Sequence, residues 1–279
     1  MEKIKKGDIV GRISYGKDIL FLVKRIINLK NGRRIAILKG ITERIEADSY
    51  INDLYLISEK DVKKELERLD TRVERRIISE QKKNSICNIE KREKIKIKTG
   101  KILHLDGDRR YSEKSYRYYK RLGLNAVVKN ISESRQPKVI YSLLVYYKPD
   151  IIVLTGHDGM IKKETAYNDI YNYRNSRYFI ESVKEARRYE RDYKCDLAIY
   201  AGACQSYFEA IMGAGANFAS SPARILIDIL DPLIVAERIA TTSKLNYLTI
   251  DDIEKDLRDG RKGIGGIGTR RKDEFVILL

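Results

Sequence analysis

The spacing of apolar positions changes character twice along the chain, and the first stretch predicts a small β unit. Over residues 1–57, short apolar runs alternate with turn residues, and Asn31-Gly32 between two such runs is a strong hairpin signal. We expect a small β-barrel of SH3 or KOW size here, which would bind peptides or nucleic acid or simply brace another domain. The expected strands are Asp8–Arg12, Ile19–Val23, Arg34–Lys39 and Ile45–Ala47.

From Ser58 onward the apolar positions recur every three or four residues, which is the period of an amphipathic helix. Ser58 is suited to cap this helix, with Asp61 in its first turn. The polar run Gln81–Ser85 then predicts that the helix loosens into an exposed linker. Residues 58–95 are therefore expected to form a charged helical linker. The apolar stripe consists of Val62, Leu66, Leu69, Val73 and Ile77.

Beyond Lys94, apolar runs of strand length alternate with helical stretches, and this predicts a doubly wound α/β unit over residues 96–279. The long apolar runs favour buried, mostly parallel strands. The expected strands are Ile102–Leu105, Ala126–Val128, Ile151–Thr155, Leu197–Ala201, Asn217–Ala219 and an edge strand at Phe275–Leu279. The expected helices lie near residues 113–122, 139–147, 178–193 and 223–240, with one more opening at Gln205.

Two of the predicted strands end just before a reactive side chain. The run Ile151–Thr155 stops before His157, and Leu197–Ala201 stops before Cys204, with only glycine and alanine in between. Catalytic groups of open α/β sheets gather at the carboxyl ends of strands, so these two side chains are expected to meet. An imidazole beside a thiol can act as base and nucleophile, and the pairing predicts a cysteine peptidase.

The same placement indicates how the thiol would be activated. If Cys204 lies where a strand turns into a helix, the helix N-terminus favours the thiolate that attacks a carbonyl. Backbone amides near Gly159 and Cys204 would form the oxyanion hole. A lone cysteine or histidine more often serves packing, but the joint placement of His157 and Cys204 favours catalysis. His104 lies inside a predicted strand and is interpreted as structural.

Composition restricts the remaining classes. The chain has 279 residues, with 56 Lys and Arg against 40 Asp and Glu, and a formal net charge of +16. Such a surface favours acidic partners, although charge runs are usually just solvated faces. Cys87, Cys195 and Cys204 give no disulfide framework, as in a reducing compartment, and the cysteines and two histidines show no metal-ligand spacing. We expect no cofactor, no secretory signal and no membrane span.

These residues resemble known families. A strand ending in a His-Gly block, followed by a strand ending in Ala-Cys, resembles the caspase, gingipain and separase clan of cysteine peptidases. More closely, Thr155–Gly159 and Gly202–Ser206 resemble the YabG family of sporulation-specific proteases, and so do Gly7–Arg12 and Leu38–Gly40 near the N-terminus. The similarity covers almost the whole chain.

The resemblance implies a caspase-like fold and a cysteine endopeptidase of spore-forming bacteria. In such a protein, His157 and Cys204 would form the catalytic dyad, and the substrates would be spore-coat and cortex-enzyme precursor proteins. The implied location is the cytoplasm of the sporulating cell, at the developing spore coat. Asp158 stands between His157 and Gly159, unlike in the wider clan, and this leaves the oxyanion donor on that side open.

The loop after the first α/β strand bears on specificity. In the caspase-like clan this loop helps line the pocket for the residue that precedes the cleaved bond, and here it carries Asp106 and Asp108. A carboxylate in a partly dry pocket favours a cation, and arginine can bind it bidentately. The resemblance therefore predicts cleavage after arginine and less readily after lysine. The alternative is that the two residues merely form an Asp-Gly turn.

Two other functions stay open at this point. The basic charge and the β-barrel would suit a non-catalytic nucleic-acid-binding or coat-assembly protein, whose binding would weaken with salt and would not need Cys204. The same Cys–His pair would also suit a deamidase or an acyltransferase. The peptidase interpretation is favoured, and on it no specific nucleic acid is expected as a partner.

Overall fold

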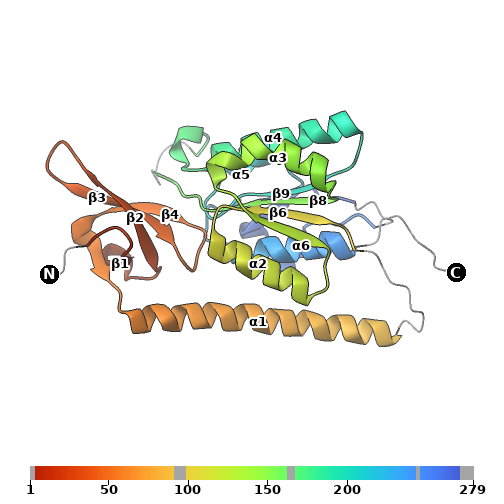
Figure 1. Cartoon of the computed structure of the whole chain (residues 1–279), viewed down its shortest axis with the longest axis horizontal. Helices are drawn as coiled ribbons and strands as arrows, with labels where there is room; N and C mark the ends of the chain where they lie inside the picture. Colours follow the sequence, from red (N-terminus) through yellow and green to blue (C-terminus); the bar gives the residue numbers. More distant parts are fainter. Residues whose placement is uncertain (1–3, 91–98, 162–166, 243–245, 271–279) are drawn as a thin grey trace.

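The computed structural model describes residues 4–90, 99–161, 167–242 and 246–270, apart from the side chains of residues 84–90. Two β-sheets are joined by a long helix (Figure 1). The smaller, antiparallel sheet lies at one end of the molecule, and the larger sheet lies between layers of helices. The predicted α/β class, with a mostly parallel sheet preceded by a small β unit, is confirmed.

The N-terminal unit is a five-stranded antiparallel sheet in the order β4-β3-β2-β1-β5. The hairpin between β2 and β3 turns at Gly32, whose φ of +78° suits glycine. Strand β5 (Leu54–Leu56) has only three residues, too few to show an alternation of apolar and polar positions, so the sequence pattern does not predict it. The strands are β1 (Ile9–Arg12), β2 (Phe21–Asn28), β3 (Arg34–Gly40), β4 (Glu46–Tyr50) and β5 (Leu54–Leu56).

Helix α1 (Glu59–Glu90) is longer than the periodicity predicts. It follows Ser58, whose hydroxyl accepts a hydrogen bond from the first turn, as expected of a cap. The helix continues through residues 81–85, so the prediction that it loosens there is wrong, although Lys82 and Lys83 are exposed as expected. Tertiary contact explains the difference, because the Gln81 side chain donates to the Arg121 carbonyl at 2.8 Å. Helix α1 is therefore docked along the larger unit (Figure 1).

The larger sheet has the order β11-β10-β9-β8-β6-β7, and its neighbours are parallel except for the edge pair β10–β11. Helices α2 and α6 cover one face and α3, α4 and α5 the other, which is the doubly wound arrangement predicted (Figure 1). The strands are β6 (Ile102–Asp106), β7 (Ala126–Asn130), β8 (Ile151–Thr155), β9 (Ala198–Ala201), β10 (Phe218–Ser220) and β11 (Ile264–Gly266). The helices are α2 (Arg109–Arg121), α3 (Gln136–Tyr147), α4 (Ser176–Tyr193), α5 (Phe208–Gly213) and α6 (Asp231–Thr241).

Some element boundaries differ from the prediction. The helix expected to open at Gln205 begins only at Phe208, after a turn. The apolar helix expected over 223–240 begins at Asp231, where a proline near its first position suits a helix start. The edge strand expected at Phe275–Leu279 lies outside the described residues.

The two sheets share one apolar core. A single cluster of buried side chains runs from Phe21 and Leu38 of the N-terminal sheet, through Ile77 of α1, to Val235 of α6. A second cluster lies on the other face of the large sheet, under α3 and α4. Within the part of the chain that the structure describes, none of the helices combines the length and the apolar character that a membrane crossing needs.

The strand order creates a switch point at β6, because β7 is added on one side of it and β8 on the other. Ligands of open α/β sheets usually bind at the carboxyl ends of the strands beside such a point. In the register of β6 and β8, Asp106 pairs with Thr155, so the residues that follow both strands lie at one edge. The N-terminal sheet covers this edge, where Ile45 forms an isolated bridge with Asp158.

Candidate active site

The loops after β8 and β9 carry the two predicted catalytic residues and lie side by side. His157 follows β8 and Cys204 follows β9, which is parallel to it. The Ser206 hydroxyl donates to Asp158 Oδ2 at 2.9 Å, which joins one loop to the other. The structure thus brings both loops to the switch-point edge. The two reactive groups form no hydrogen bond with each other, because His157 Nε2 donates to the Gly40 carbonyl and the Cys204 sulfur accepts from the Ile227 amide.

Asp158 organises this part of the site. Its buried carboxylate accepts hydrogen bonds from the hydroxyls of Ser176 and Ser206 and from the amides of Gly159 and Asn175, both at 2.8 Å. Burial raises the pKa of Asp158 to about 6, although these hydrogen bonds act in the opposite direction. The Gly159 amide, an expected oxyanion donor, is therefore engaged by a carboxylate in this state.

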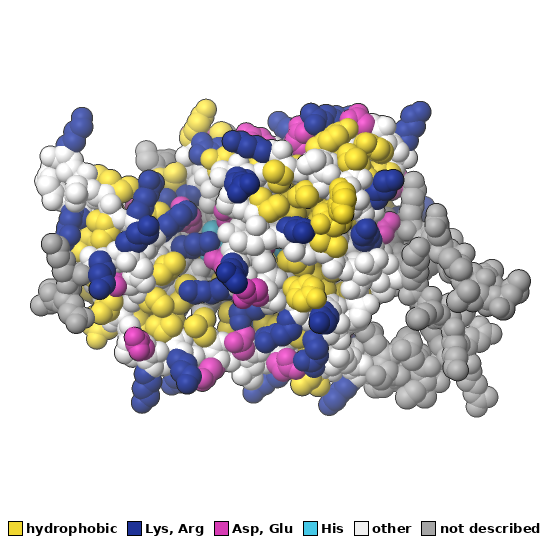
Figure 2. Space-filling model, viewed as in Figure 1, with side chains coloured by type: hydrophobic (Ala, Val, Ile, Leu, Met, Phe, Trp, Pro, Cys, Tyr) yellow, Lys and Arg dark blue, Asp and Glu magenta, His cyan; other side chains and the backbone are white. Residues whose placement is uncertain are grey.

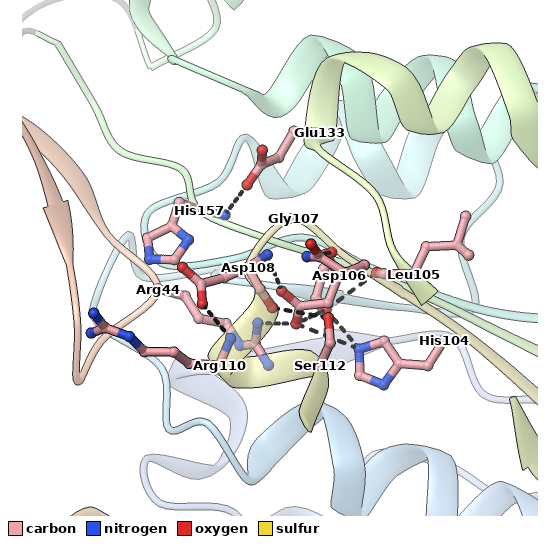
Figure 3. A network of polar contacts seen from close by, with 12 residues as sticks. Arg44, His104, Leu105, Asp106, Gly107, Asp108, Arg110, Ser112, Glu133 and His157 are labelled. Carbon is pink, nitrogen blue, oxygen red and sulfur yellow. Dashed lines mark hydrogen bonds and ion pairs between the residues drawn. The ribbon is translucent and has the colours of Figure 1, made fainter. Parts of the chain in front are cut away.

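His157 is completely buried and neutral. Its Nε2 donates to the Gly40 carbonyl at 2.8 Å, while Nδ1 has no hydrogen-bond partner among the described residues. Burial lowers the pKa of His157 to about 3, and the charge of Lys39 acts in the same direction. The His157 backbone is held by Glu133, whose Oε1 accepts from the amide at 2.7 Å (Figure 3). The ring of Tyr111 lies 5.5 Å from the imidazole, centre to centre.

Cys204 is also completely buried, and it does not lie at a helix N-terminus. The prediction that Cys204 lies at a helix N-terminus is wrong, because a turn separates Cys204 from α5, which begins at Phe208. The thiol sulfur accepts a hydrogen bond from the Ile227 amide at 3.3 Å. Burial raises the pKa of Cys204 to about 12, and the nearby carboxyl of Glu43 adds to the effect. The thiol is therefore protonated in this state.

Asp106 and Asp108 flank the turn after β6 (Figure 3). The buried Asp106 carboxylate forms an ion pair with the guanidinium of Arg44 and accepts from Thr155 Oγ1 at 2.8 Å. Burial opposes ionisation, but Arg44 holds the pKa of Asp106 below its usual value. Asp108 pairs with Lys39 Nζ at 2.8 Å and caps α2. Both carboxylates thus bind cations of β3 or of the turn between β3 and β4.

His104 is placed as the structural interpretation expects. It lies within β6, and its ring nitrogens contact Tyr119 Oη at 3.1 Å and Thr155 Oγ1 at 2.7 Å. Burial lowers its pKa to about 3. Cys195 lies before β9, away from the carboxyl edge. In the parts of the chain that are described, no cluster of histidine, cysteine and carboxylate side chains could hold a metal ion.

Sequence reasoning misses the residues that enclose the site. Gly40, Arg44, Tyr111 and Glu133 lie far from His157 and Cys204 in the sequence, and each is a common residue type in a turn or helix. Their roles depend on the contact between the two sheets. The one sequence signal for these residues is the resemblance of Leu38–Gly40 to the YabG family. It marks Gly40 but does not show that Gly40 contacts His157.

Comparison with known proteins adds to this geometry. The sequence matches the family described as YabG peptidase U57 over residues 5–275. The sporulation-specific protease YabG of Bacillus subtilis (strain 168) is 35% identical over 277 residues, covering 95% of this chain and 94% of that protein. The receiver domain of the histidine kinase CKI1 from Arabidopsis thaliana, complexed with Mg2+, gives a TM-score of 0.27 at 16% identity over 42% of this chain and 79% of that one. That likeness is too slight to carry an argument.

Proposed function

Because this chain belongs to the YabG peptidase U57 family, we propose that it is a cysteine endopeptidase with a Cys204–His157 dyad. One observation carries the proposal: the loops that hold the thiol and the imidazole are bonded to each other through Ser206 and Asp158, at 2.9 Å. Of the residues that the structure describes, no other cysteine or histidine follows the carboxyl end of a strand in the large sheet.

The proposed reaction begins when His157 takes the proton of the Cys204 thiol and the thiolate attacks the substrate carbonyl. Backbone amides hold the resulting oxyanion, and those of Cys204 and Gly159 are the candidates. The Gly159 amide would exchange Asp158 Oδ1, at 2.8 Å, for the substrate oxygen. His157 then gives its proton to the leaving amine, and water releases the acyl group from sulfur.

The larger unit supports the resemblance to the caspase-like clan. The two dyad residues follow neighbouring parallel strands, β8 and β9, and α4 is the return helix between them. The five-stranded N-terminal sheet has the strand count of a small barrel of the SH3 or KOW type. Residues 1–57, 58–95 and 96–279 remain our proposed division of the chain, with helix α1 docked rather than free.

We propose that the substrates are spore-coat and cortex-enzyme precursors, processed in the cytoplasm of the sporulating cell at the developing coat. The support is the relative from Bacillus subtilis, which is named a sporulation-specific protease. No cofactor enters the proposed reaction, because thiol, imidazole and water supply every group that reacts.

We also propose cleavage after arginine, with Asp106 as the anion of the pocket. Asp106 lies at the end of β6, beside the dyad loops, and it already binds a guanidinium, that of Arg44. Asp108 is the weaker candidate, because it binds the ammonium of Lys39 rather than a guanidinium and caps α2 by accepting from the Arg110 amide at 2.8 Å.

Incubation with purified spore-coat precursors tests this function. Wild type and Cys204→Ala are compared, and any new termini are mapped by mass spectrometry. We expect new carboxyl termini at arginine with the wild type and none with Cys204→Ala. New termini of equal yield in both samples would reject the thiol mechanism.

A further inference from the structure

One short segment of the N-terminal unit contacts three of the side chains proposed for the active site. This segment, Lys39–Glu46, is named the occluding segment. Lys39 Nζ lies 2.8 Å from Asp108, and the Gly40 carbonyl accepts from His157 Nε2 at 2.8 Å. Arg44, which follows in the same turn, forms an ion pair with Asp106. A segment that only braced the fold would not need to contact all three.

The Arg44 side chain fills a pocket suited to a guanidinium. It is fully buried, and its guanidinium carbon lies 4.4 Å from the centre of the Tyr111 ring. A carboxylate at one end and an aromatic face along the side are the contacts that arginine recognition uses. Arg44 Nε and Nη2 have no hydrogen-bond partner among the described residues. Buried arginine donors are normally satisfied, so Arg44 is an incomplete fit to this pocket.

The backbone of the occluding segment pairs with the chain just after His157. The Asp158 amide donates to the Arg44 carbonyl at 3.2 Å, and the Glu46 amide donates to the Asp158 carbonyl at 2.8 Å. At Gly159 a Cβ atom would lie 2.2 Å from the Glu46 carbonyl oxygen, so only glycine fits against the segment. Extended peptides bind to sheet edges by this kind of main-chain pairing.

We propose that the occluding segment occupies the substrate cleft of this protein, with Arg44 in the pocket for the residue that precedes the cleaved bond. Tyr111 is the second specificity-determining residue of that pocket, beside Asp106. The inference rests on the proposed Cys204–His157 function. It adds that the occluding segment fills the cleft and that Tyr111 helps to recognise arginine. The structure is then the closed state, and substrate enters when the segment leaves.

The closed state accounts for the burial of the dyad. Both His157 and Cys204 have no exposed surface, although an endopeptidase must admit a chain to them. A hollow of about 530 Å³ lies directly outside the segment, lined by Lys39, Gly40, Asp108 and the first turn of α2. Departure of the segment would join this hollow to the buried pocket.

The first test measures the rate at which iodoacetamide alkylates Cys204, with Cys195 in the same sample as reference. Arg44→Ala should raise the Cys204 rate between about 10- and 1,000-fold, since minor states are commonly populated at about 0.1–10%. Asp48→Asn is the matched control, because it removes another ion pair between the N-terminal sheet and the larger unit, with Arg174 in the loop before α4, without emptying the pocket. It should leave the rate near that of the wild type.

Arg44→Ala leaves the buried Asp106 without its cation, and this could impair folding. A second variant therefore tests the same proposal with Arg44 retained. In Gly40→Ala the new Cβ would lie 2.3 Å from the Glu43 carbonyl oxygen, so the turn must rearrange while Arg44 is kept. We expect the same rise in alkylation. If both variants fold, as shown by circular dichroism, and both are alkylated at the wild-type rate, the segment does not occlude the site.

Recognition by Tyr111 is measured with peptides that differ only in arginine or leucine before the cleaved bond, in the Arg44→Ala background. Tyr111→Leu should lower the ratio of kcat/KM for arginine over leucine by about 2- to 30-fold, and Tyr111→Phe should keep it. An unchanged ratio in Tyr111→Leu would overturn the pocket assignment. If alkylation rises but no variant cleaves any peptide, the proposed function fails while occlusion stands.

Discussion

At the scale of single residues, the site is an enclosed set of ionisable groups whose states follow from burial and partners. His157 is neutral and Cys204 is protonated because both are removed from water. Asp106 keeps its charge because Arg44 supplies a cation. In the closed state these groups do not react. They become reactive when water and substrate replace the occluding segment.

Asp106 should determine the preference for arginine. Asp106→Asn keeps the shape of the side chain and removes its charge, and hydrogen bonds to charged groups are worth about 1.5–3 kcal/mol. We expect the kcat/KM ratio for matched arginine and leucine peptides to fall about 10- to 100-fold, and Asp108→Asn to change it less. A ratio unchanged in both variants would show that the pocket lies elsewhere.

Glu43 should make stability depend on pH. Burial raises its pKa to about 7 from 4.5, although the Arg258 guanidinium, 3.6 Å away, opposes the shift and Asp228 adds to it. A carboxyl whose folded pKa is raised favours the folded state below 4.5 and loses that contribution as pH rises through 7. Urea unfolding of wild type and Glu43→Gln should show the variant gaining relative stability from about pH 5 to about pH 8. A constant difference would mean that Glu43 titrates normally.

At the scale of elements, helix α1 packs against both the N-terminal sheet and the larger unit and so joins them. Its buried stripe of Leu69, Val73 and Ile77 belongs to the same core as the N-terminal sheet and α6. Arg72 pairs with Asp228 at 2.9 Å, which ties the helix to the segment before α6. The helix therefore holds the occluding segment against the cleft indirectly, through the sheet that carries it.

Two adjacent isoleucines of α1 test the docking. Ile77 is 0% exposed and Ile78 is 42% exposed. Ile77→Ala should lower the free energy of unfolding by about 2–5 kcal/mol, because it leaves a cavity in the core. Ile78→Ala should change it by less than about 0.5 kcal/mol. Equal effects in chemical denaturation would contradict the docked position of α1.

The elements also show what the sequence could predict. Apolar runs locate β8 and β9 and hence bring His157 and Cys204 to one edge, because strand ends are encoded locally. The turn that delays α5 until Phe208 depends on how residues 204–207 bond to neighbouring loops, so the expected helix N-terminus at Cys204 is wrong. The contact of Arg44 with Asp106 joins distant segments, and no local pattern encodes it.

At the scale of the whole molecule, the formal net charge is +16. Figure 2 shows Lys and Arg side chains interspersed with Asp, Glu and apolar groups over the visible face. Some cations are paired within their own helix, such as Arg68 with Glu65 in α1 and Arg188 with Glu185 in α4. A nucleic-acid-binding protein typically gathers its cations in one stripe or patch, and this face has none.

On the peptidase proposal, nucleic-acid binding should be weak and independent of the dyad. We expect retention on immobilised duplex DNA to fall steeply between about 50 and about 200 mM salt, equally for wild type and Cys204→Ala. Sequence-specific retention that persists at the higher salt would favour the non-catalytic alternative.

Trapping the acyl-enzyme is the most direct test of the central claim that Cys204 is the nucleophile. Wild type and Arg44→Ala are mixed with an arginine ester substrate, quenched in acid and digested for mass spectrometry. We predict the acyl mass on the peptide that contains Cys204, with a higher yield in Arg44→Ala and no acyl adduct in Cys204→Ala. An acyl group on Cys195, or hydrolysis at the wild-type rate by Cys204→Ala, would contradict it.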